Sequence, residues 1–239
     1  MTKDWLAGLA AGLTLPSIPY IFYWSTLTRI DCLALALSMA GLWVIARWYK
    51  RGWGVILAAL LLTAAAYTRQ TYLLAAPLAA FGWMWGRRER FGALAFAVLV
   101  GCLVLGIFAV LMVATRGGIF FHVITANVNA LNPAIIETYW MELSRYLPAF
   151  LIGVAVYLLI GALFGRPAWW LIAPYCVAAA LVALTISKVG SDVNYLFELS
   201  AAFCFAAGGL IALARRWFPL RAAALVALAL AVSMATHAV

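Results

Sequence analysis

A polar segment from Lys188 to Glu198 separates two long apolar stretches and carries side chains that could do chemistry. Gly190 permits a tight turn, and either Ser191 or Asp192 can cap the helix that follows. The free N–H groups at such a helix start point outward and bind anions. We therefore predict an anion-binding helix start here, and the alternative is that Ser191 and Asp192 only cap the helix.

Two polar side chains lie in the first turns of this predicted helix. Asn194 and Glu198 are four residues apart, so they would share one helical face. A carboxylate about one turn inside an apolar helix is unfavourable, and it is by default a functional group. The alternative is a structural ion pair with an arginine of another helix, and Arg29 and Arg69 are the expected partners in either case.

Two short turns carry these arginines. Arg29 and Asp31 stand where a turn enters an apolar segment, so Asp31 either takes part in chemistry or only complements the dipole of a helix N-terminus. Arg69 and Gln70 form a two-residue turn between two apolar segments. A guanidinium there either neutralises a helix C-terminus or binds phosphate through paired hydrogen bonds.

His122 follows the sequence Arg116-Gly-Gly118 on a long polar segment. The ordinary pKa of histidine suits proton transfer, and a structural role is the alternative. The four cysteines lie within apolar segments, with no C-x-x-C spacing and no histidine at ligand spacing, so they indicate neither a zinc site nor a disulfide framework. We expect no resident cofactor, and a divalent metal stays an open alternative.

The charged residues fall into two sets on alternate sides of the apolar segments. Eleven of the sixteen Lys and Arg lie on one side with Asp4 and Glu89, whereas five of the seven Asp and Glu lie on the other. Basic residues on one side are typical of a cytoplasmic face. Because they occupy short separate turns, we expect no nucleic-acid partner. The basic side comprises Lys3, Arg47, Lys50, Arg51, Arg87, Arg88, Arg90, Arg166, Arg215, Arg216 and Arg221.

The composition predicts a polytopic membrane protein. Hydrophobic residues make up 68% of the 239 residues and charged residues 10%, which leaves too little polar surface for a soluble domain. A transmembrane helix needs about 20 mostly apolar residues. We predict an all-α transmembrane bundle of about nine spans, in a single domain over residues 1–239. The predicted spans are 5–24, 32–46, 53–68, 71–86, 91–115, 147–165, 168–187, 195–214 and 219–237.

This arrangement predicts an integral membrane protein with a cytoplasmic N-terminus and an external C-terminus. The longest external segment, residues 116–146, starts as a loop, and Asn132-Pro133 is a start signal for a helix. Apolar residues from Ile136 to Leu143 recur at helical spacing. We expect an amphipathic helix that contacts lipid at the outer membrane surface.

Four sequence motifs carry a resemblance to a known enzyme class. They are Trp24…Arg29-Ile-Asp31-Cys-Leu-Ala-Leu, Tyr67-Thr-Arg69-Gln70-Thr-Tyr-Leu-Leu-Ala-Ala-Pro77, Thr115-Arg-Gly-Gly118 with Phe121-His122, and Lys188-Val-Gly-Ser191-Asp-Val-Asn194-Tyr195. Together they resemble the bacterial GT-C superfamily, whose members include polyprenyl-phosphate mannosyl and aminoarabinosyl transferases. The resemblance extends from about Trp24 to Gly209.

The resemblance implies a bacterial plasma-membrane enzyme that takes a sugar from a polyprenyl-phosphate donor at the outer face and passes it, with inversion, to a glycan or lipid acceptor. Arg69 and Lys188 would neutralise the phosphate, assisted by the helix start near Ser191. The candidate catalytic residues are Asp31, Asp192, Glu198 and His122. The candidate substrate-binding residues are Arg29, Arg69, Gln70, Lys188, Ser191, Asn194 and Tyr195.

The chain departs from this family near its start. Such enzymes carry a catalytic carboxylate in a large loop after the first helix, whereas the first outer turn here, from Ser25 to Asp31, is short. The opening helices match the middle of these enzymes better than their start. We therefore expect an N-terminally truncated chain that lacks the catalytic loop, and the alternative is that Asp31 has an unrelated role.

Three functions compete at this point. A glycosyltransferase, or the portion of one that binds the donor lipid, is the leading hypothesis. A transporter or lipid flippase is the second, but transporters usually show repeated halves and broken helices near the bilayer midplane, whereas the polar residues here gather at one surface. The third is a membrane assembly subunit without chemistry of its own.

Overall fold

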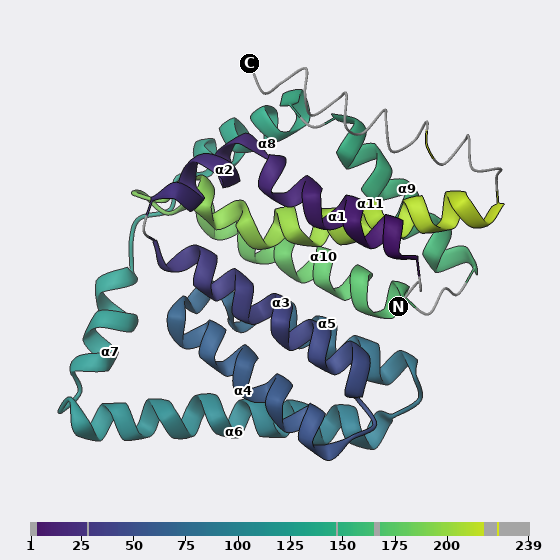
Figure 1. The fold of residues 1–239 in the computed structure, drawn as a ribbon. Coiled ribbons are helices and arrows are strands. Elements are labelled where there is room, and N and C mark those ends of the chain that lie inside the picture. The colour runs from purple at the N-terminus through teal and green to yellow at the C-terminus, as the bar shows by residue number, and fades with distance from the viewer. Residues whose placement is uncertain (1–3, 28, 147, 165–167, 218–223, 225–239) are drawn as a thin grey trace.

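The protein, seen in a computed structural model, is described over residues 4–27, 29–146, 148–164, 168–217 and 224. Within these ranges all regular elements are helices, which confirms the all-α class (Figure 1). The α-helices are α1 (Trp5–Ser17), α2 (Pro19–Thr26), α3 (Ile30–Trp48), α4 (Gly52–Thr68), α5 (Ala75–Gly86), α6 (Arg90–Ala114), α7 (Gly118–Val123), α8 (Pro133–Tyr146), α9 (Pro148–Phe164), α10 (Trp169–Ala183) and α11 (Phe197–Trp217). The 3-10 helices are η1 (Gln70–Leu73), η2 (Thr125–Asn127), η3 (Leu184–Ser187) and η4 (Val193–Leu196).

Four helical stretches of the described residues are long and apolar enough to cross a membrane, and the pair α1 and α2 makes a fifth if it counts as one span. The chain therefore has the make-up of an integral membrane protein, with four or five candidate spans where the sequence predicts nine. The four stretches are Ile30–Trp48, Arg90–Ala114, Trp169–Ser187 and Val193–Arg216.

The other predicted spans differ from the expectation for separate reasons. α4 and α9 are apolar but have 17 residues each. The 3-10 helix η1 takes up the first residues of the predicted span 71–86, so α5 has only 12 residues and a length of about 18 Å. That length falls short of a hydrocarbon core of about 30 Å. The predicted span 219–237 lies outside the described residues, apart from residue 224.

The short helix α5 lies in the centre of the bundle. Its residues Ala75, Ala76, Ala79 and Ala80 are completely buried. Gly82 lies against α10, where a Cβ atom would come within 2.7 Å of Pro174. Small side chains thus allow α5 and α10 to approach closely, and the surrounding helices shelter a segment that is too short to span alone.

The predicted first span, residues 5–24, is a bent pair of helices. α1 and α2 meet at an angle of 66° around Ile18. Pro19 occupies the first position of α2, where its missing N–H and fixed φ suit a helix start and prevent the continuation of α1. Tyr20 in α2 forms a hydrogen bond with Ser200 in α11, which ties the bent pair to the bundle.

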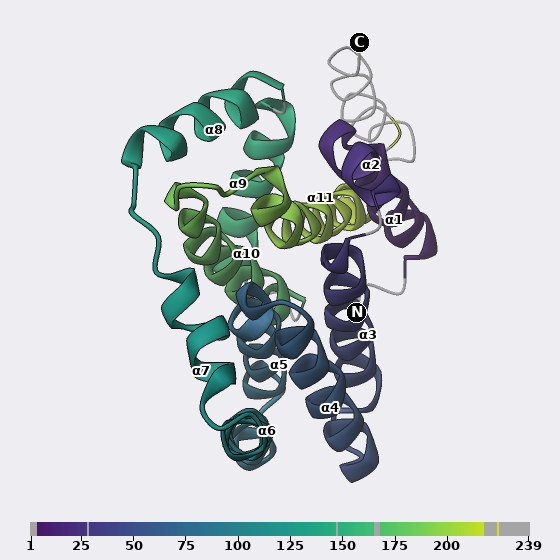
Figure 2. The ribbon, with the colours of Figure 1, turned by 90° about the vertical axis from the view of Figure 1, so that its left-hand side faces the viewer.

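The long predicted segment 116–146 forms α7, η2 and α8, which run along one end of the bundle (Figure 2). The predicted helix start is confirmed, since α8 begins at Pro133 and Asn132 Oδ1 accepts a hydrogen bond of 3.1 Å from the Ala134 N–H. α8 is amphipathic, with Leu143 buried and Trp140 exposed.

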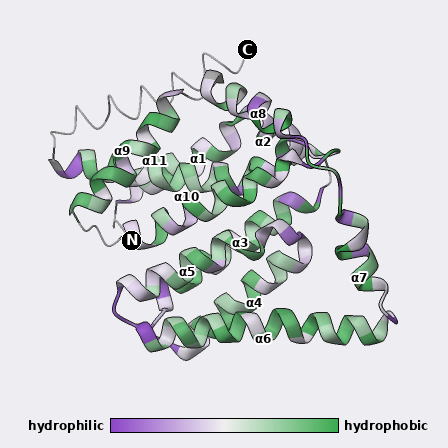
Figure 3. Cartoon of the chain, turned by 180° about the vertical axis from the view of Figure 1, so that it is seen from behind, coloured by the Kyte–Doolittle hydropathy of each residue, from purple (hydrophilic) through white to green (hydrophobic). Residues whose placement is uncertain are grey.

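Hydrophilic residues gather at the two ends of the bundle, with apolar helices between them (Figure 3). α3 shows this polarity in one element, since Asp31 lies in its first turn and Arg47 in its last. The 19 residues of α3 place these ends about 28 Å apart. We call the end at Asp31 the pocket end and the end at Arg47 the opposite end.

Candidate functional site

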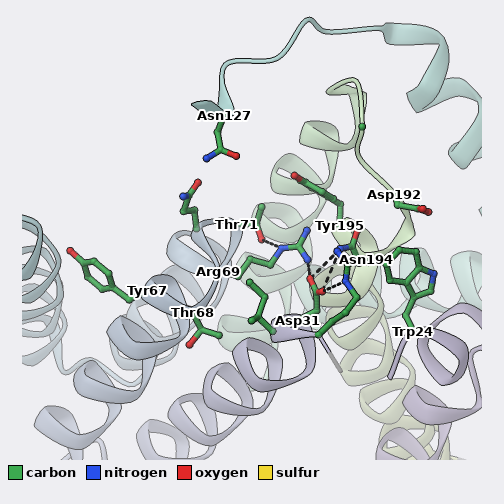
Figure 4. Close-up of a pocket in the computed structure, with 14 residues that line it drawn as sticks. Trp24, Asp31, Tyr67, Thr68, Arg69, Thr71, Asn127, Asp192, Asn194 and Tyr195 are labelled. Carbon is green, nitrogen blue, oxygen red and sulfur yellow. Dashed lines mark hydrogen bonds and ion pairs between the residues drawn. The ribbon is translucent and has the colours of Figure 1, made fainter. Parts of the chain in front are cut away.

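The pocket end contains a cavity of about 430 Å³ where α3 begins and α4 ends (Figure 4). Its walls come from four parts of the chain that are far apart in the sequence. The lining residues are Trp24, Arg29, Ile30, Asp31, Tyr67, Thr68, Arg69, Gln70, Thr71, Asn127, Gly190, Asp192, Asn194 and Tyr195.

Asp31 is the centre of the polar network at the base of this pocket. Its side chain is only 1% exposed, and it forms ion pairs with Arg69 and with Arg29, whose Nε lies 3.2 Å from Oδ2. Asn194 Nδ2 donates to both carboxylate oxygens, at 3.3 and 3.4 Å. A buried carboxylate requires such partners. Asp31 therefore holds the two arginines and the asparagine in fixed positions.

Asp31 and Arg69 come together because α3 and α4 pack side by side. The chain turns back between them, so the start of α3 lies beside the end of α4, and Arg69 is the C-terminal cap of α4. Arg69 has an extended backbone, with φ −153° and ψ 124°, which carries the chain away from the helix. Asn194 arrives from η4, 163 residues beyond Asp31.

The two arginines differ in accessibility. The Arg29 side chain is 45% exposed and stacks 4.5 Å from the centre of the Trp24 ring, whereas Arg69 is 11% exposed and stacks at the same distance on Tyr195. Arg69 Nε also donates to Thr71 Oγ1 at 3.1 Å. Burial lowers the pKa of the Arg69 guanidinium, although an arginine stays protonated in a protein. Arg29 is thus the more accessible cation for a ligand.

Two connected loops cover the pocket end. The backbone N–H of Asn132 donates to the Ser187 carbonyl at 2.8 Å, and the Val189 N–H donates to the Ala130 carbonyl at 3.0 Å. The loop before α8 and the loop before η4 are therefore joined. Asn127, the last residue of η2 before the first of these loops, belongs to the pocket lining, and the second loop contributes Gly190 and Asp192.

Asp192 is the cap at the start of η4. Its Oδ1 accepts a hydrogen bond of 2.7 Å from the Val193 N–H and one of 3.3 Å from the Tyr139 hydroxyl. Ser191 instead donates to the Thr185 carbonyl at 3.4 Å. The helix start that the sequence predicts to bind an anion is a four-residue 3-10 helix, and a carboxylate already accepts from its first N–H.

Seven of the eleven predicted site residues line the pocket, and four do not. Lys188 is held in a backbone bridge with Leu131, and it lies outside the pocket lining, so the structure does not join it to Arg69 there. His122 is exposed on α7, where its carbonyl accepts from Asn127 Nδ2 at 2.8 Å. The seven in the lining are Arg29, Asp31, Arg69, Gln70, Asp192, Asn194 and Tyr195.

Glu198 lies deeper in the bundle, as the sequence predicts, and is 3% exposed. The sequence predicts that Glu198 pairs with Arg29 or Arg69, but both arginines pair with Asp31 instead. Among the described residues no side chain donates a hydrogen bond to the Glu198 carboxylate, which lies beside the Ala76 backbone N–H at the start of α5. Glu198 is therefore a buried carboxylate below the pocket without an ion-pair partner in the described residues.

Several lining residues escape prediction from the sequence. Tyr67, Thr68 and Thr71 flank Arg69 in the chain, and their position beside a predicted site residue is the signal that points to them. Asn127 has no such signal, because its place depends on the joined loops. Nowhere in the described ranges do three or more His, Cys, Asp or Glu side chains gather in a group that could hold a metal ion.

Comparison of the chain with models of protein families, with curated proteins and with solved structures finds no match. Two arginines, the carboxamides of Gln70, Asn127 and Asn194, several hydroxyls and the carboxylates of Asp31 and Asp192 line the pocket. This set suits a small ligand that carries an anionic group and hydrogen-bonding groups.

Proposed function

We propose that this chain is a membrane glycosyltransferase of the GT-C kind, or the portion of one that binds the donor lipid, and that it uses a polyprenyl-phosphate sugar at the outer face of the membrane. The observation that supports this proposal is the meeting of Arg29 and Arg69 in one pocket at one end of an apolar bundle. A phosphate on a lipid would approach the protein at that depth.

The charges around the two arginines support a ligand with a single negative charge. Arg29 and Arg69 carry two positive charges, and the buried Asp31, which pairs with both, neutralises one of them. Asp192 balances the lining as a whole, but its carboxylate accepts from Val193 and Tyr139 and pairs with neither arginine. Asp31 keeps Arg69 rigid, and the exposed Arg29 is then available to a phosphodiester. In this proposal Asp31 positions the arginines and is no base, since both of its oxygens already accept hydrogen bonds or ion pairs.

The sugar and the acceptor would lie over the exposed part of the pocket. Asp192 is exposed there, and its carboxylate can accept a hydrogen bond from a sugar hydroxyl or a proton from an acceptor hydroxyl. Gln70 adds exposed amide groups. The volume of about 430 Å³ lies within the range of small-molecule sites. The acceptor in this proposal is a glycan or a lipid, and the proposal includes no resident cofactor, with a divalent metal as the open alternative.

A binding experiment tests the phosphate site. Arg29→Ala should weaken the binding of undecaprenyl phosphate by about 1.5–3 kcal/mol, the range for a hydrogen bond to a charged group. Arg116→Ala is the matched control, because Arg116 is an exposed arginine outside the pocket lining. Affinity within twofold of the wild type for Arg29→Ala, or an equal loss for Arg116→Ala, would remove the proposal.

A transfer experiment tests the reaction. Asp192→Asn keeps the size of the side chain and removes the acceptor charge, so the protein should still bind undecaprenyl phosphate but lose sugar transfer. Movement of the lipid across vesicles without transfer by the wild type would favour a flippase. Binding with neither reaction would favour a donor-binding subunit.

The proposed setting is a bacterial plasma membrane, with nine spans, the N-terminus in the cytoplasm and the pocket and the C-terminus outside. Its support is the separation of basic and acidic residues in the sequence. Single cysteines in a cysteine-free background test the topology. A membrane-impermeant reagent should label positions 129 and 191 in intact cells and should label positions 88 and 216 only after lysis. The reverse pattern would invert the topology.

A further inference from the structure

A strongly basic surface occupies the opposite end of the bundle from the pocket. It is formed by the turn between α3 and α4 and the turn between α5 and α6, and five of its six basic side chains are exposed. We call it the basic patch. It consists of Arg47, Lys50, Arg51, Arg87, Arg88 and Arg90.

Two contacts hold these turns together. Lys50 Nζ lies 3.7 Å from Glu89 Oε1, across the two turns. The Tyr49 and Trp83 rings pack edge to face, with their centres 6.2 Å apart. Within these two turns Glu89 is the sole acidic residue, so one carboxylate faces six cations. The patch is therefore one continuous surface with a large excess of positive charge.

Aromatic rings hold Arg87 and Lys50, and of these two cations only Lys50 also has a carboxylate partner, Glu89, in the described residues. The Arg87 guanidinium lies 4.2 Å from the centre of the Trp83 ring, and Lys50 Nζ lies 5.9 Å from that of Tyr49. Since Tyr49 and Trp83 pack together, Arg87 and Lys50 stand at the two ends of a short row of rings. A ring attracts a cation through its quadrupole and leaves the N–H donors for another partner. Arg87 Nε is buried and has no hydrogen-bond partner in the described structure.

The backbone of the patch is strained at one residue. Arg88 has a φ of 64°, in the left-handed region, where a residue with a side chain is strained and glycine is not. Arg116, outside the patch, shares this conformation with a φ of 50°, so the strain alone assigns no function.

Membrane topology alone requires basic residues in each cytoplasmic turn, but it does not require two turns to be joined or their cations to be stacked on rings. The tryptophans near the patch are typical of the depth of lipid headgroups. A ligand at this depth that carries negative charge is an anionic phospholipid.

We propose that the basic patch binds the headgroup of an anionic phospholipid, and that a headgroup with two phosphates binds more tightly than one with a single phosphate. Lys50 lies in one turn and Arg87 in the other, so the basic side chains of each turn can bind one phosphate. This proposal does not depend on the function proposed for the pocket, which lies about 28 Å away along α3.

The test measures lipid binding to the purified full chain in a neutral detergent, with cardiolipin, phosphatidylglycerol and phosphatidylcholine added separately. Native mass spectrometry gives the bound fraction, and the shift of the thermal midpoint gives an independent reading. Cardiolipin should bind most tightly and phosphatidylcholine least. Arg88→Gln with Arg90→Gln should weaken cardiolipin binding roughly 30-fold, the factor for two basic side chains near anionic lipid.

The charge-matched control is Arg116→Gln with Arg216→Gln, which removes two exposed arginines outside the patch. It should bind cardiolipin within threefold of the wild type. Equal losses in both double variants would show attraction by net charge alone and would overturn the proposal, as would a short DNA duplex that binds the patch when cardiolipin does not.

One further variant separates binding from folding. Arg88→Gly relieves the left-handed strain, so its thermal midpoint without lipid should equal or exceed that of the wild type. Its affinity for cardiolipin should nevertheless fall. Unchanged affinity in a variant that is folded and stable would contradict the role of this arginine.

Discussion

Replacing Asp31 with alanine leaves the guanidinium of Arg69 buried without its counter-charge. The Arg69 side chain is 11% exposed and Asp31 is 1% exposed, so their pair belongs to the buried class, in which the loss of one partner costs about 3–5 kcal/mol. The Arg29 pair adds little, because Arg29 is 45% exposed and exposed pairs contribute about 0–1 kcal/mol. We expect Asp31→Ala to lower the free energy of unfolding by about 3–5 kcal/mol.

Unfolding in mixed detergent micelles, followed by the fluorescence of the tryptophans, measures this loss. Glu89→Ala is the matched control, because the Lys50–Glu89 pair is long, at 3.7 Å, and exposed, so it should change stability by less than about 1 kcal/mol. The double variant Asp31→Leu with Arg69→Leu removes both charges, and it should be much more stable than Asp31→Ala. If Asp31→Ala cost less than about 1 kcal/mol, or if the double variant were no better, the charges would not be a buried pair.

Three further predictions concern backbone, hydrogen bonding and charge. Gly190→Ala should lower the free energy of unfolding by about 1–2 kcal/mol, because the φ of Gly190, +88°, is left-handed. Gly101 lies within helix α6 with open space around it, so Gly101→Ala should raise the free energy of unfolding by about 0.5–1 kcal/mol in the same assay. Equal effects of the two substitutions would contradict this prediction. Tyr67→Phe should lower the unfolding free energy by about 0.5–1.5 kcal/mol, since its hydroxyl donates to the Val104 carbonyl at 2.6 Å, and an unchanged thermal midpoint would refute it. Glu198→Gln should not lower the thermal midpoint, because no side chain of the described residues pairs with this carboxylate, but it should reduce sugar transfer if the carboxylate below the pocket supports the proposed reaction; unchanged transfer would exclude that role.

Much of the architecture follows from local patterns. The apolar runs predict helices, and Asn132-Pro133 predicts the start of α8, because a cap and a helix start need only neighbouring residues. Span lengths are harder to predict. The break at Ile18 and the 3-10 helix before α5 shorten two predicted spans, and nothing in hydrophobicity alone distinguishes a spanning helix from a sheltered one.

The candidate site could be predicted in its residue types but not in its pairings. Arg29, Asp31, Arg69 and Asn194 each stand out as polar residues beside apolar helices. Their partners depend on which helix ends meet, and Asp31 and Asn194 are 163 residues apart. The sequence predicts a pair between Glu198 and an arginine, but Arg29 and Arg69 both pair with Asp31, which lies in the first turn of α3.

Arginines are held by different kinds of contact at the two ends of α3, and this difference indicates that the two ends bind different ligands. At the pocket end a buried carboxylate fixes Arg69 at close range, which favours a defined geometry and a ligand with little charge. At the opposite end the rings of Trp83 and Trp85 hold Arg87 and Arg90 while their charge remains, which favours tight but less directional attraction. Raised salt should therefore weaken binding at the basic patch far more than at the pocket, and this contrast is measurable with one protein and two lipids.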